Sequence, residues 1–445
     1  MKIVIVGFGS AGYAALMAIK RQRGDHQIIV IDPKEYDLFH PCGLPFALEK
    51  SLTGDDLKQD LNLSFLGVEK KRGLVTKIIP QERKIFYRDP LSQELKDLSY
   101  QALVLTTGSQ PALPPVAGLT DLYQKGIYSF TKFQDFSAID QKILSSEEVV
   151  VIGGGAIGLE TAVALKKRGK NIILLEREAQ LLSGIIDQDL AQIVKKYLEE
   201  QGIIIKLGKN LQGVSLAGRK IKFDLGEECL EADLGILATG VKPNITLVEE
   251  ADLEVKAGGI GVNKFLQTSD PNIYAAGDLI ANWSLMDKKA FSPKLATSAY
   301  KQGTLVGFNI LGGRHEYRGT CGTFVSKIGE LEVAGTGYSM EMALSLGYQP
   351  VGGKIKAEIL PAYFPNNEEV SIKVIADSLS GKILGGQAVG RKGTAERINL
   401  ISLALETDLS LDELSKIELA YCPAVSEVYD PLLRAVDFAR RKIKK

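Results

Sequence analysis

The amino-acid sequence predicts an α/β fold that contains two separate parallel-sheet units. Two glycine-rich turns, at residues 7–12 and 153–158, each follow a continuous β-branched run typical of strands buried on both faces. An apolar helical stretch and a second strand follow each turn. The chain has 445 residues, more than one hydrophobic core usually serves, so two or three domains are expected.

The first unit covers residues 2–32, with "KIVIVGFGSAG", "YAALMAIKRQR" and "QIIVID" as strand and turn, helix, and second strand. Gly7, Gly9 and Gly12 form the pattern G-x-G-x-x-G, and Asp32 ends the second strand. In a Rossmann-like unit these glycines permit the tight turn, the approach of a pyrophosphate, and close helix packing. A terminal carboxylate can hold ribose hydroxyls. A chance glycine-rich turn is the alternative, but the strand–helix–strand frame favours a dinucleotide site.

The same pattern recurs at 148–177, "EVVVIGGGAIGLETAVALKKRGKNIILLER". Gly153, Gly155 and Gly158 repeat the glycine spacing, and Glu176 ends the second strand. A carboxylate there favours the 2′-hydroxyl of NADH over the 2′-phosphate of NADPH. Arg177 beside it can pair with a phosphate, so NADPH stays an alternative.

Two intact glycine patterns in one chain indicate two dinucleotides. A nicotinamide that gives hydride to a flavin uses such a pair directly. The alternative is a duplicated fold in which one site no longer binds. The sequence therefore predicts an enzyme with FAD and a reduced nicotinamide cofactor.

Bulk composition describes an ordinary globular protein, with 45% hydrophobic and 24% charged residues. Lys+Arg and Asp+Glu balance at 54 each, so no nucleic-acid or anionic-lipid partner is expected. No apolar run is long enough for a membrane span, and the start reads as a strand instead of a signal peptide. Four scattered cysteines have neither metal-ligand nor disulfide-framework spacing. We expect no metal site and a cytoplasmic location.

Three further stretches complete an ordered set of motifs: "LVLTTGSQPALPPVAG" (103–118), "LGILATGVKPN" (234–244) and "TSDPNIYAAGDLI" (268–280). With the two glycine patterns, the chain resembles the pyridine nucleotide–disulfide oxidoreductases over essentially its whole length. The resemblance implies a glutathione-reductase-like fold with two Rossmann-like domains and a C-terminal α+β dimerisation domain, in a homodimer. The implied segments are 1–112 and 244–318 for the FAD domain, 113–243 for the NAD(P)H domain, and 319–445 for the dimerisation domain.

The resemblance also implies most of the cofactor-binding residues. Asp278 would hold the flavin ribityl chain, although alone it could be a simple turn residue after Gly277. The stretch 293–303 would run beside the isoalloxazine, and Glu160 would lie near the nicotinamide. The predicted FAD residues are Gly7, Gly9, Ser10, Ala11, Gly12, Asp32, Pro33, Val75, Thr107, Gly108, Gly277, Asp278, Leu295, Ala296 and Thr297. The predicted NAD(P)H residues are Gly153, Gly155, Ala156, Ile157, Gly158, Glu160, Glu176 and Gly240.

One cysteine, Cys42 in "LFHPCGLPFAL", lies where a helix is expected to begin. Ala47 stands five residues later, so the C-x-x-x-x-C pair of glutathione-type reductases cannot form. "HPCGLPF" instead resembles the single-cysteine branch: coenzyme A disulfide, persulfide and polysulfide reductases, NADH oxidases and NADH peroxidases. Helix amides lower a thiol pKa and favour the nucleophilic thiolate. The competing interpretation is a buried, inert cysteine.

A departure from the branch narrows the chemistry. The peroxidases and water-forming oxidases that resemble this chain carry a histidine in the first glycine loop, where this chain has Ser10. Peroxide chemistry is therefore less expected. His40 could donate a proton, but a solvated loop histidine is the simpler interpretation.

The C-terminal stretches "LPAYFPNN" (360–367) and "ELAYCPAVSEVYDPLL" (418–433) resemble segments of coenzyme A disulfide reductases that reach across the dimer to the cysteine. Tyr363 and Tyr421 match their tyrosines, and a phenol can protonate a departing thiolate. Interface packing of the two tyrosines is the alternative. An intersubunit pair between Cys422 and Cys42 depends on geometry and stays open.

Two smaller expectations concern the substrate. Basic residues Lys20, Arg21 and Arg23 end the first helix, where they either contact substrate phosphates or simply favour the helix terminus. We expect no appended rhodanese-like domain after "RRKIKK", so a sulfur substrate would arrive by diffusion.

The predicted function is transfer of hydride from NADH through FAD and Cys42 to a low-molecular-weight disulfide, persulfide or polysulfide. In a first alternative, electrons pass from the flavin directly to oxygen, a quinone or a ferric ion. In a second, the chain is an NADH-sensing flavoprotein that recruits a partner, which the absence of long charged or disordered tails disfavours.

Overall fold

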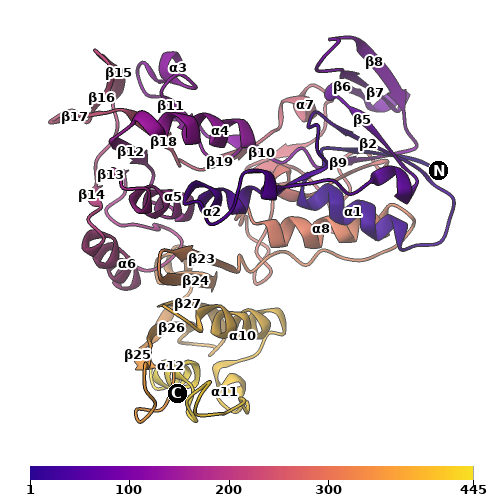
Figure 1. The fold of residues 1–445 in the computed structure, drawn as a ribbon. Helices are drawn as coiled ribbons and strands as arrows, with labels where there is room; N and C mark the ends of the chain where they lie inside the picture. The colour runs from indigo at the N-terminus through magenta and orange to yellow at the C-terminus, as the bar shows by residue number, and fades with distance from the viewer. Residues whose placement is uncertain (444–445) are drawn as a thin grey trace. The chain divides into compact units, whose positions relative to one another are not determined.

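The computed structural model describes residues 1–443, and the chain forms two compact units (Figure 1). Unit 1 comprises Met1–Gly43, Thr53–Ala112 and Val241–Gly322. Unit 2 comprises Leu44–Leu52, Leu113–Gly240 and the chain from Thr323 onward. The four domain segments expected from the sequence stay a prediction. Among the described residues, no helix is both long and apolar enough to cross a bilayer.

A five-stranded parallel sheet, in the order β22-β9-β1-β2-β5, forms the centre of unit 1. Its inner strands β1, β2 and β9 are largely apolar because both of their faces are buried, whereas the edge strand β5 has the charged sequence VEKKR. The expected strand–turn–helix–strand order at residues 2–32 is confirmed by β1, α1 and β2. The bounds are β1 (Lys2–Val6), β2 (Gln27–Asp32), β5 (Val68–Arg72), β9 (Ala102–Leu105), β22 (Ile273–Ala275) and α1 (Ser10–Lys20).

Helix α8 (Ala296–Asn309) packs along α1 in unit 1 (Figure 1). The two helices approach closely because Gly303 and Gly307 face α1, where an added Cβ would overlap the carbonyl oxygens of Ala11 and Ala15. This packing places the start of α8 near the first glycine loop, since Gly277 lies between Ala11 and Ala299.

The remaining sheets of unit 1 are antiparallel. The sheet β6-β7-β8 forms a hairpin extension, and β10 pairs with β19 although more than a hundred residues separate them in the chain. This ladder brings the two ends of the intervening segment together. The bounds are β6 (Leu74–Ile79), β7 (Lys84–Arg88), β8 (Leu95–Ser99), β10 (Ser109–Pro111), β19 (Val241–Pro243), β3 (Leu38–Phe39), β4 (Lys58–Gln59), β20 (Val255–Lys256) and β21 (Gly259–Ile260).

Unit 2 contains a second parallel sheet, β11-β18-β12-β13-β14, with α5 as the crossover between β12 and β13. The second expected strand–turn–helix–strand unit is therefore confirmed. The bounds are β11 (Ile127–Ser129), β12 (Glu148–Ile152), β13 (Asn171–Glu176), β14 (Ile204–Leu207), β18 (Leu234–Leu237), α2 (Leu44–Leu48), α3 (Leu119–Leu122), α4 (Phe133–Lys142), α5 (Ala156–Lys167), α6 (Gln188–Glu200), α7 (Thr246–Glu249, in unit 1), and the antiparallel strands β15 (Gly213–Ala217), β16 (Lys220–Asp224) and β17 (Cys229–Ala232).

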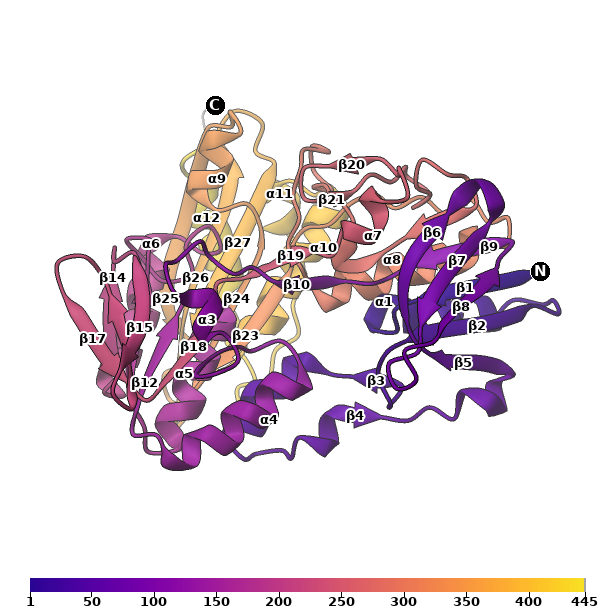
Figure 2. The same ribbon diagram turned by 90° about the horizontal axis from the view of Figure 1, so that it is seen from above.

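The C-terminal part of unit 2 is an antiparallel sheet in the order β23-β24-β27-β26-β25, with α10 and α12 packed against it (Figure 2). Glycines let these helices approach, because an added Cβ at Gly353 would overlap the carbonyl oxygen of Ala435 on α12. The predicted α/β class with a C-terminal α+β segment is confirmed. The bounds are β23 (Phe324–Ile328), β24 (Leu331–Gly337), β25 (Pro350–Glu358), β26 (Glu369–Asp377), β27 (Ile383–Gly390), α9 (Met340–Ser345), α10 (Thr394–Glu406), α11 (Leu411–Leu414) and α12 (Pro431–Arg440).

Candidate functional site

The first glycine loop, between β1 and α1 in unit 1, has the backbone that a pyrophosphate site requires. Gly7 has φ +87°, and an added Cβ would collide with the carbonyl oxygen of Thr106. A Cβ at Gly12 would overlap the carbonyl oxygen of Gly7, so only glycine lets α1 start here. Gly9 differs, because no heavy atom lies within 4 Å of its added Cβ. The middle of the loop is therefore open at the N-terminus of α1, where backbone amides attract phosphate.

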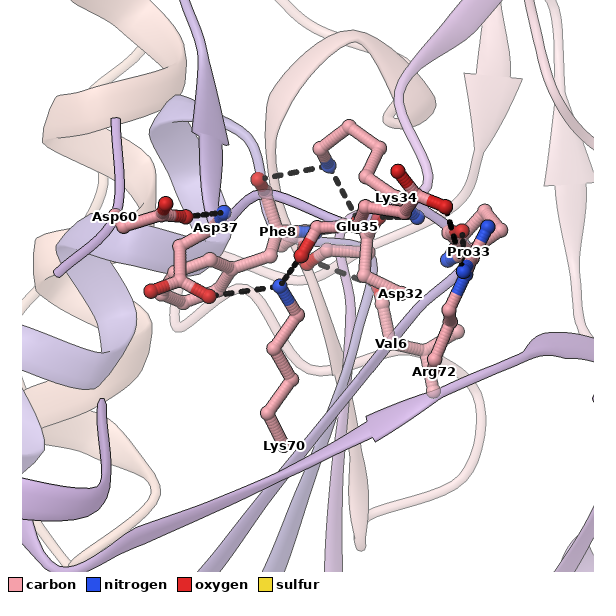
Figure 3. A network of polar contacts seen from close by, with 12 residues as sticks. Val6, Phe8, Asp32, Pro33, Lys34, Glu35, Asp37, Asp60, Lys70 and Arg72 are labelled. Atoms are coloured by element: carbon pink, nitrogen blue, oxygen red, sulfur yellow. Dashed lines mark hydrogen bonds and ion pairs between the residues drawn. The ribbon is translucent and has the colours of Figure 1, made fainter. Parts of the chain in front are cut away.

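Asp32, at the end of β2, is oriented by the backbone on both sides (Figure 3). Its side chain accepts hydrogen bonds from the backbone N–H of Phe8 at 2.7 Å and of Lys34 at 2.9 Å. The ammonium of Lys34 lies 2.7 Å from Asp32 Oδ2 and 3.2 Å from the carbonyl oxygen of Phe8. Sequence reasoning selected Asp32 and missed Lys34, although a lysine two residues after the acid was a readable signal.

The segment after Asp32 is fixed by basic side chains of β5 (Figure 3). Lys70 Nζ contacts Asp37 Oδ1 at 2.7 Å and donates to the carbonyl oxygen of Glu35 at 3.0 Å. Arg72 donates to the carbonyl oxygen of Pro33 at 3.3 Å and pairs with the Glu35 carboxylate at 2.8 Å. These contacts hold Pro33 beside the acid that ends β2.

Asp278 follows Gly277 after β22 and receives a hydrogen bond from Ser109 Oγ at 2.8 Å. The Lys294 ammonium donates to the carbonyl oxygens of Asp278 at 2.8 Å and Gly258 at 3.1 Å, and burial lowers the pKa of Lys294. Asp278, Lys294 and Leu295 line one small cavity of unit 1. A carboxylate held at a cavity wall can accept hydroxyl hydrogen bonds, as a ribityl chain requires.

The other predicted FAD residues lie on the same unit. Val75 is buried on β6, and Thr107 and Gly108 form the turn after β9, with Gly108 at φ +67°. Ser10 and Ala11 begin α1, and Ala296 and Thr297 begin α8. Assignment of these residues to FAD stays a prediction.

The second glycine loop, between β12 and α5 in unit 2, repeats the geometry of the first. Added Cβ atoms at Gly153 and Gly158 would collide with the carbonyl oxygens of Ala238 and Gly153. No heavy atom lies within 4 Å of the Cβ position of Gly155. Ala156 begins α5, and Ile157 is 45% exposed beside the open glycine. This loop has the same open middle position as the first.

Glu176, at the end of β13, is oriented by the backbone in the same way as Asp32. Its carboxylate oxygens accept from the backbone N–H of Gly154 at 2.5 Å and of Glu178 at 2.8 Å. The residue two positions after the acid differs between the two units: it is Glu178 here and Lys34 in unit 1. Arg177 is directed at Glu178 Oε1, with its Nε at 3.1 Å and Nη2 at 2.9 Å. Arg177 is thus paired with the Glu178 carboxylate, and the preference for NADH over NADPH stays a prediction.

Glu160 lies on α5, two residues after Gly158, and its carboxylate is directed at β23 in unit 2. Ser326 Oγ donates to Glu160 Oε1 at 2.5 Å, and the backbone of Lys327 supplies a second hydrogen bond. Burial raises the pKa of Glu160, and both hydrogen bonds act against that rise. Ser326 is another residue that sequence reasoning missed.

Cys42 is exposed on a short 3₁₀ turn, Pro41–Gly43, in unit 1. The turn is held by hydrogen bonds from Gly43 N–H to the carbonyl oxygen of His40 at 3.0 Å, and from His40 N–H to Leu57 at 2.9 Å. Exposure contradicts the alternative of a buried cysteine. The expected helix is confirmed in α2. It has only five residues, so its dipole would stabilise a thiolate only weakly.

The end of α2 is attached to α4 and α5 within unit 2. Arg168 Nη1 donates to the carbonyl oxygen of Leu48 and to Asp140, both at 3.0 Å. Asp140 also pairs with Lys50 at 2.7 Å, and Glu49 pairs with Lys167 at 2.7 Å. Helix α5 therefore begins at the second glycine loop and ends on the helix that follows Cys42 in the chain.

Tyr363 and Tyr421 lie together in unit 2, although they are 58 positions apart in the sequence. Their phenols are hydrogen-bonded, and this contact with Tyr363 raises the pKa of Tyr421. Tyr363 is 74% exposed and Tyr421 is 47% exposed. Cys422 is exposed beside them, and its carbonyl oxygen accepts from Val425 and Ser426 at 2.8 Å each. The structure holds Cys422 as an exposed thiol, and the intersubunit pair with Cys42 stays an open alternative.

Comparison with known proteins places this geometry in a family. Residues 1–303 match the pyridine nucleotide-disulphide oxidoreductase domain, and residues 324–432 match the dimerisation domain of that family. The chain belongs to the pyridine nucleotide-disulphide oxidoreductases. It is therefore an oxidoreductase, and FAD and NAD(P)H are the cofactors of this family. Both glycine loops fit them, because each leaves its middle glycine open at a helix N-terminus.

Three similar oxidoreductases cover nearly the whole chain. The NADH oxidase of Methanocaldococcus jannaschii is 34% identical over 100% of this chain and 99% of its own. The CoA-dependent NAD(P)H sulfur oxidoreductase of Pyrococcus furiosus is 32% identical over 97% of both chains. The reduced CoADR-RHD structure of Bacillus anthracis has a TM-score of 0.95 and 29% identity, over 99% of this chain and 80% of the other.

Proposed function

We propose that this oxidoreductase passes electrons from a reduced nicotinamide through Cys42 to a low-molecular-weight disulfide, persulfide or polysulfide. The observation that carries the proposal is the exposed Cys42 thiol, with Ala47 where a dithiol enzyme would have its second cysteine. Because position 47 holds no second cysteine, Cys42 would react with an external sulfur atom instead of closing an internal disulfide there. The 32% identity to the CoA-dependent NAD(P)H sulfur oxidoreductase of P. furiosus supports a sulfur acceptor.

FAD and NADH would bind at two separate nucleotide sites, one in each unit. In unit 1, the amides around Gly9 would bind the FAD pyrophosphate, Asp32 a ribose, and Asp278 the ribityl hydroxyls. In unit 2, the amides around Gly155 and the Glu176 carboxylate would bind NADH in the same manner. Bound FAD supplies the two-electron link between a nicotinamide and a thiol.

Cys42 acts as the nucleophile toward the acceptor. Its thiolate attacks one sulfur of a disulfide, so the S–S bond breaks, a mixed disulfide with Cys42 forms, and the other half leaves as a thiolate. Two-electron reduction of the mixed disulfide then restores the Cys42 thiolate and releases the second half. Each departing thiolate takes one proton.

Tyr421 is the proposed donor of that proton. Its raised pKa keeps the phenol protonated at neutral pH, as a general acid requires. In the homodimer that the dimerisation domain supports, the tyrosine pair of one subunit would serve Cys42 of the other. We place the enzyme in the cytoplasm, where a reactive thiol stays reduced.

Direct transfer of electrons from the flavin to oxygen, a quinone or a ferric ion is the second candidate. It is favoured by the 34% identity to a protein named NADH oxidase. Under this alternative Cys42 would have no part in turnover. Ser10 stands in the first glycine loop where the peroxidases and water-forming oxidases carry a histidine, so further reduction of peroxide is less expected on this route.

Steady-state turnover of wild type and Cys42→Ser separates the candidates. NADH oxidation is measured with coenzyme A disulfide, polysulfide, oxygen and a ferric chelate, and Cys229→Ser is the matched control on an exposed thiol. We expect Cys42→Ser to lose sulfur-acceptor turnover by on the order of 10³-fold while Cys229→Ser keeps it. Full activity of Cys42→Ser with every acceptor contradicts the thiol mechanism and leaves the direct route.

A further inference from the structure

The Glu160 carboxyl is held from outside its own helix, by the first strand of the C-terminal sheet. Ser326 Oγ lies 2.5 Å from Glu160 Oε1, and the next residue, Lys327, adds a backbone N–H. Ser326 is 5% exposed, so its hydroxyl is directed inward from β23. All of these residues belong to unit 2.

An acid at this position is not explained by packing. Its neighbours on α5, Leu159 and Val163, are buried apolar residues, and Ile328 follows on the inward side of β23 with 0% exposure. An apolar pair across α5 and β23 would avoid the desolvation of a carboxyl, which is unfavourable unless donors compensate it. Burial indeed raises the pKa of Glu160. A carboxyl group that is buried in spite of its desolvation cost, next to a nucleotide loop, indicates a functional position.

The contact between Ser326 and Glu160 also fixes the orientation of the Glu160 carboxyl group. Donors from β23 hold the Glu160 carboxyl in one orientation relative to α5, whose first residue, Ala156, starts at the open glycine loop. A carboxylate oxygen is the acceptor that a carboxamide N–H, such as that of a nicotinamide, would contact. Loss of the Ser326 hydroxyl would leave Glu160 with one donor fewer and more than one accessible rotamer.

We propose that Ser326 is a positioning residue that orients Glu160 toward the carboxamide of the reduced nicotinamide. The inference assumes one part of the proposed function, that NADH binds at the Gly155 loop. It does not depend on the identity of the sulfur acceptor. The C-terminal sheet thus contributes to nicotinamide binding within the same chain, in addition to its part in the dimer.

The test is equilibrium binding of NADH to FAD-loaded enzyme that has first been fully reduced with dithionite in the absence of oxygen, so that no hydride can pass to the flavin during the titration. Three variants are compared with wild type: Ser326→Ala, which removes the hydroxyl; Ser326→Thr, which keeps it; and Ser371→Ala. Ser371 is the matched control, because it lies on β26 of the same sheet with the same 5% exposure. We expect Ser326→Ala to raise the Kd for NADH about 10-fold, and the other two to change it less than about 2-fold.

A double-mutant cycle ties the effect to Glu160. Glu160→Gln keeps the size of the side chain, and in that background Ser326→Ala should cause no further loss of NADH affinity. A full 10-fold loss in the Glu160→Gln background, or equal losses in Ser326→Ala and Ser371→Ala, would overturn the proposal. So would unchanged NADH affinity in Ser326→Ala.

Reoxidation of dithionite-reduced enzyme by a disulfide provides the second readout. We expect Ser326→Ala to match wild type there, because that step does not involve NADH; a slowed step in this variant overturns the positioning role. If wild type itself fails to reduce any sulfur acceptor while Ser326→Ala still weakens NADH binding, the acceptor assignment fails and the role of Ser326 stands. If Ser326→Ala does not fold, two other variants decide: Ser326→Thr must keep the wild-type Kd for NADH and Glu160→Gln must raise it, and any other result overturns the proposal.

Discussion

The phenols of Tyr363 and Tyr421 are hydrogen-bonded to each other on an exposed part of unit 2. Two large aromatic side chains that are 74% and 47% exposed are not explained by the core of their own chain. Their contact raises the pKa of Tyr421, so the pair is suited to proton donation as well as to an interface.

Tyr421→Phe should lower turnover with a disulfide by on the order of 10²-fold, because the departing thiolate loses its proton donor. A general acid acts while it is protonated, so activity falls as pH rises through its pKa. Since Tyr363 raises that pKa, Tyr363→Phe should move the alkaline limb of the rate profile to lower pH. The measurement is kcat from pH 7 to 11 for the three proteins. An alkaline limb that stays in place in Tyr363→Phe would contradict the acid role.

Lys34 should contribute to FAD binding through Asp32. Asp32 is 4% exposed, and the Lys34 ammonium is its charged partner at 2.7 Å. Lys34→Met leaves the carboxylate with two backbone donors, so we expect the Kd for FAD to rise about 10-fold. Lys77→Met, an exposed site on β6, is the control. Tighter FAD binding in Lys34→Met would instead mean that Lys34 competes with the ribose for Asp32.

Glu178 should influence the choice of coenzyme by holding Arg177. The two side chains are exposed, and such ion pairs contribute about 0–1 kcal/mol. Glu178→Gln should therefore increase kcat/KM for NADPH by up to about 5-fold, since Arg177 can turn to a 2′-phosphate, with little change for NADH. The ratio of the two kcat/KM values is the measurement. An unchanged ratio would exclude Arg177 as a phosphate ligand.

The buried pair of Arg397 and Asp430 should secure the end of the segment that carries Tyr421. Asp430 accepts from Arg397 Nε at 3.0 Å and Nη2 at 2.7 Å, and it also caps α12 through Leu432 N–H at 2.7 Å. Asp430→Ala leaves a buried guanidinium, so we expect a loss of about 3 kcal/mol in the free energy of unfolding. Denaturant unfolding checks this, with the exposed Asp408→Ala as control. Equal stability of the two variants would be inconsistent with the role.

The glycine loops could be predicted from the sequence because their requirement is local. Gly7 and Gly153 need a positive φ, and Gly12 and Gly158 pack on the turn that precedes them, so the spacing itself contains the constraint. The acids at the ends of β2 and β13 follow from the same frame.

The side-chain partners of those residues could not be predicted. Ser326 is 166 positions from Glu160, and Arg168 is 120 positions from Leu48. Contacts at such separation depend on how sheets and helices pack, which no periodicity in a single sequence encodes. Cys42 shows the same limit, since its motif predicted a helix but not that α2 ends after five residues.

The two half-reactions of the FAD-loaded enzyme test the central claim most directly. In stopped flow, wild type and Cys42→Ser are first reduced by NADH and then mixed with coenzyme A disulfide in the absence of oxygen. If electrons leave through Cys42, both proteins are reduced by NADH at similar rates, and only wild type is rapidly reoxidised. Equally fast reoxidation of Cys42→Ser by the disulfide would contradict the account.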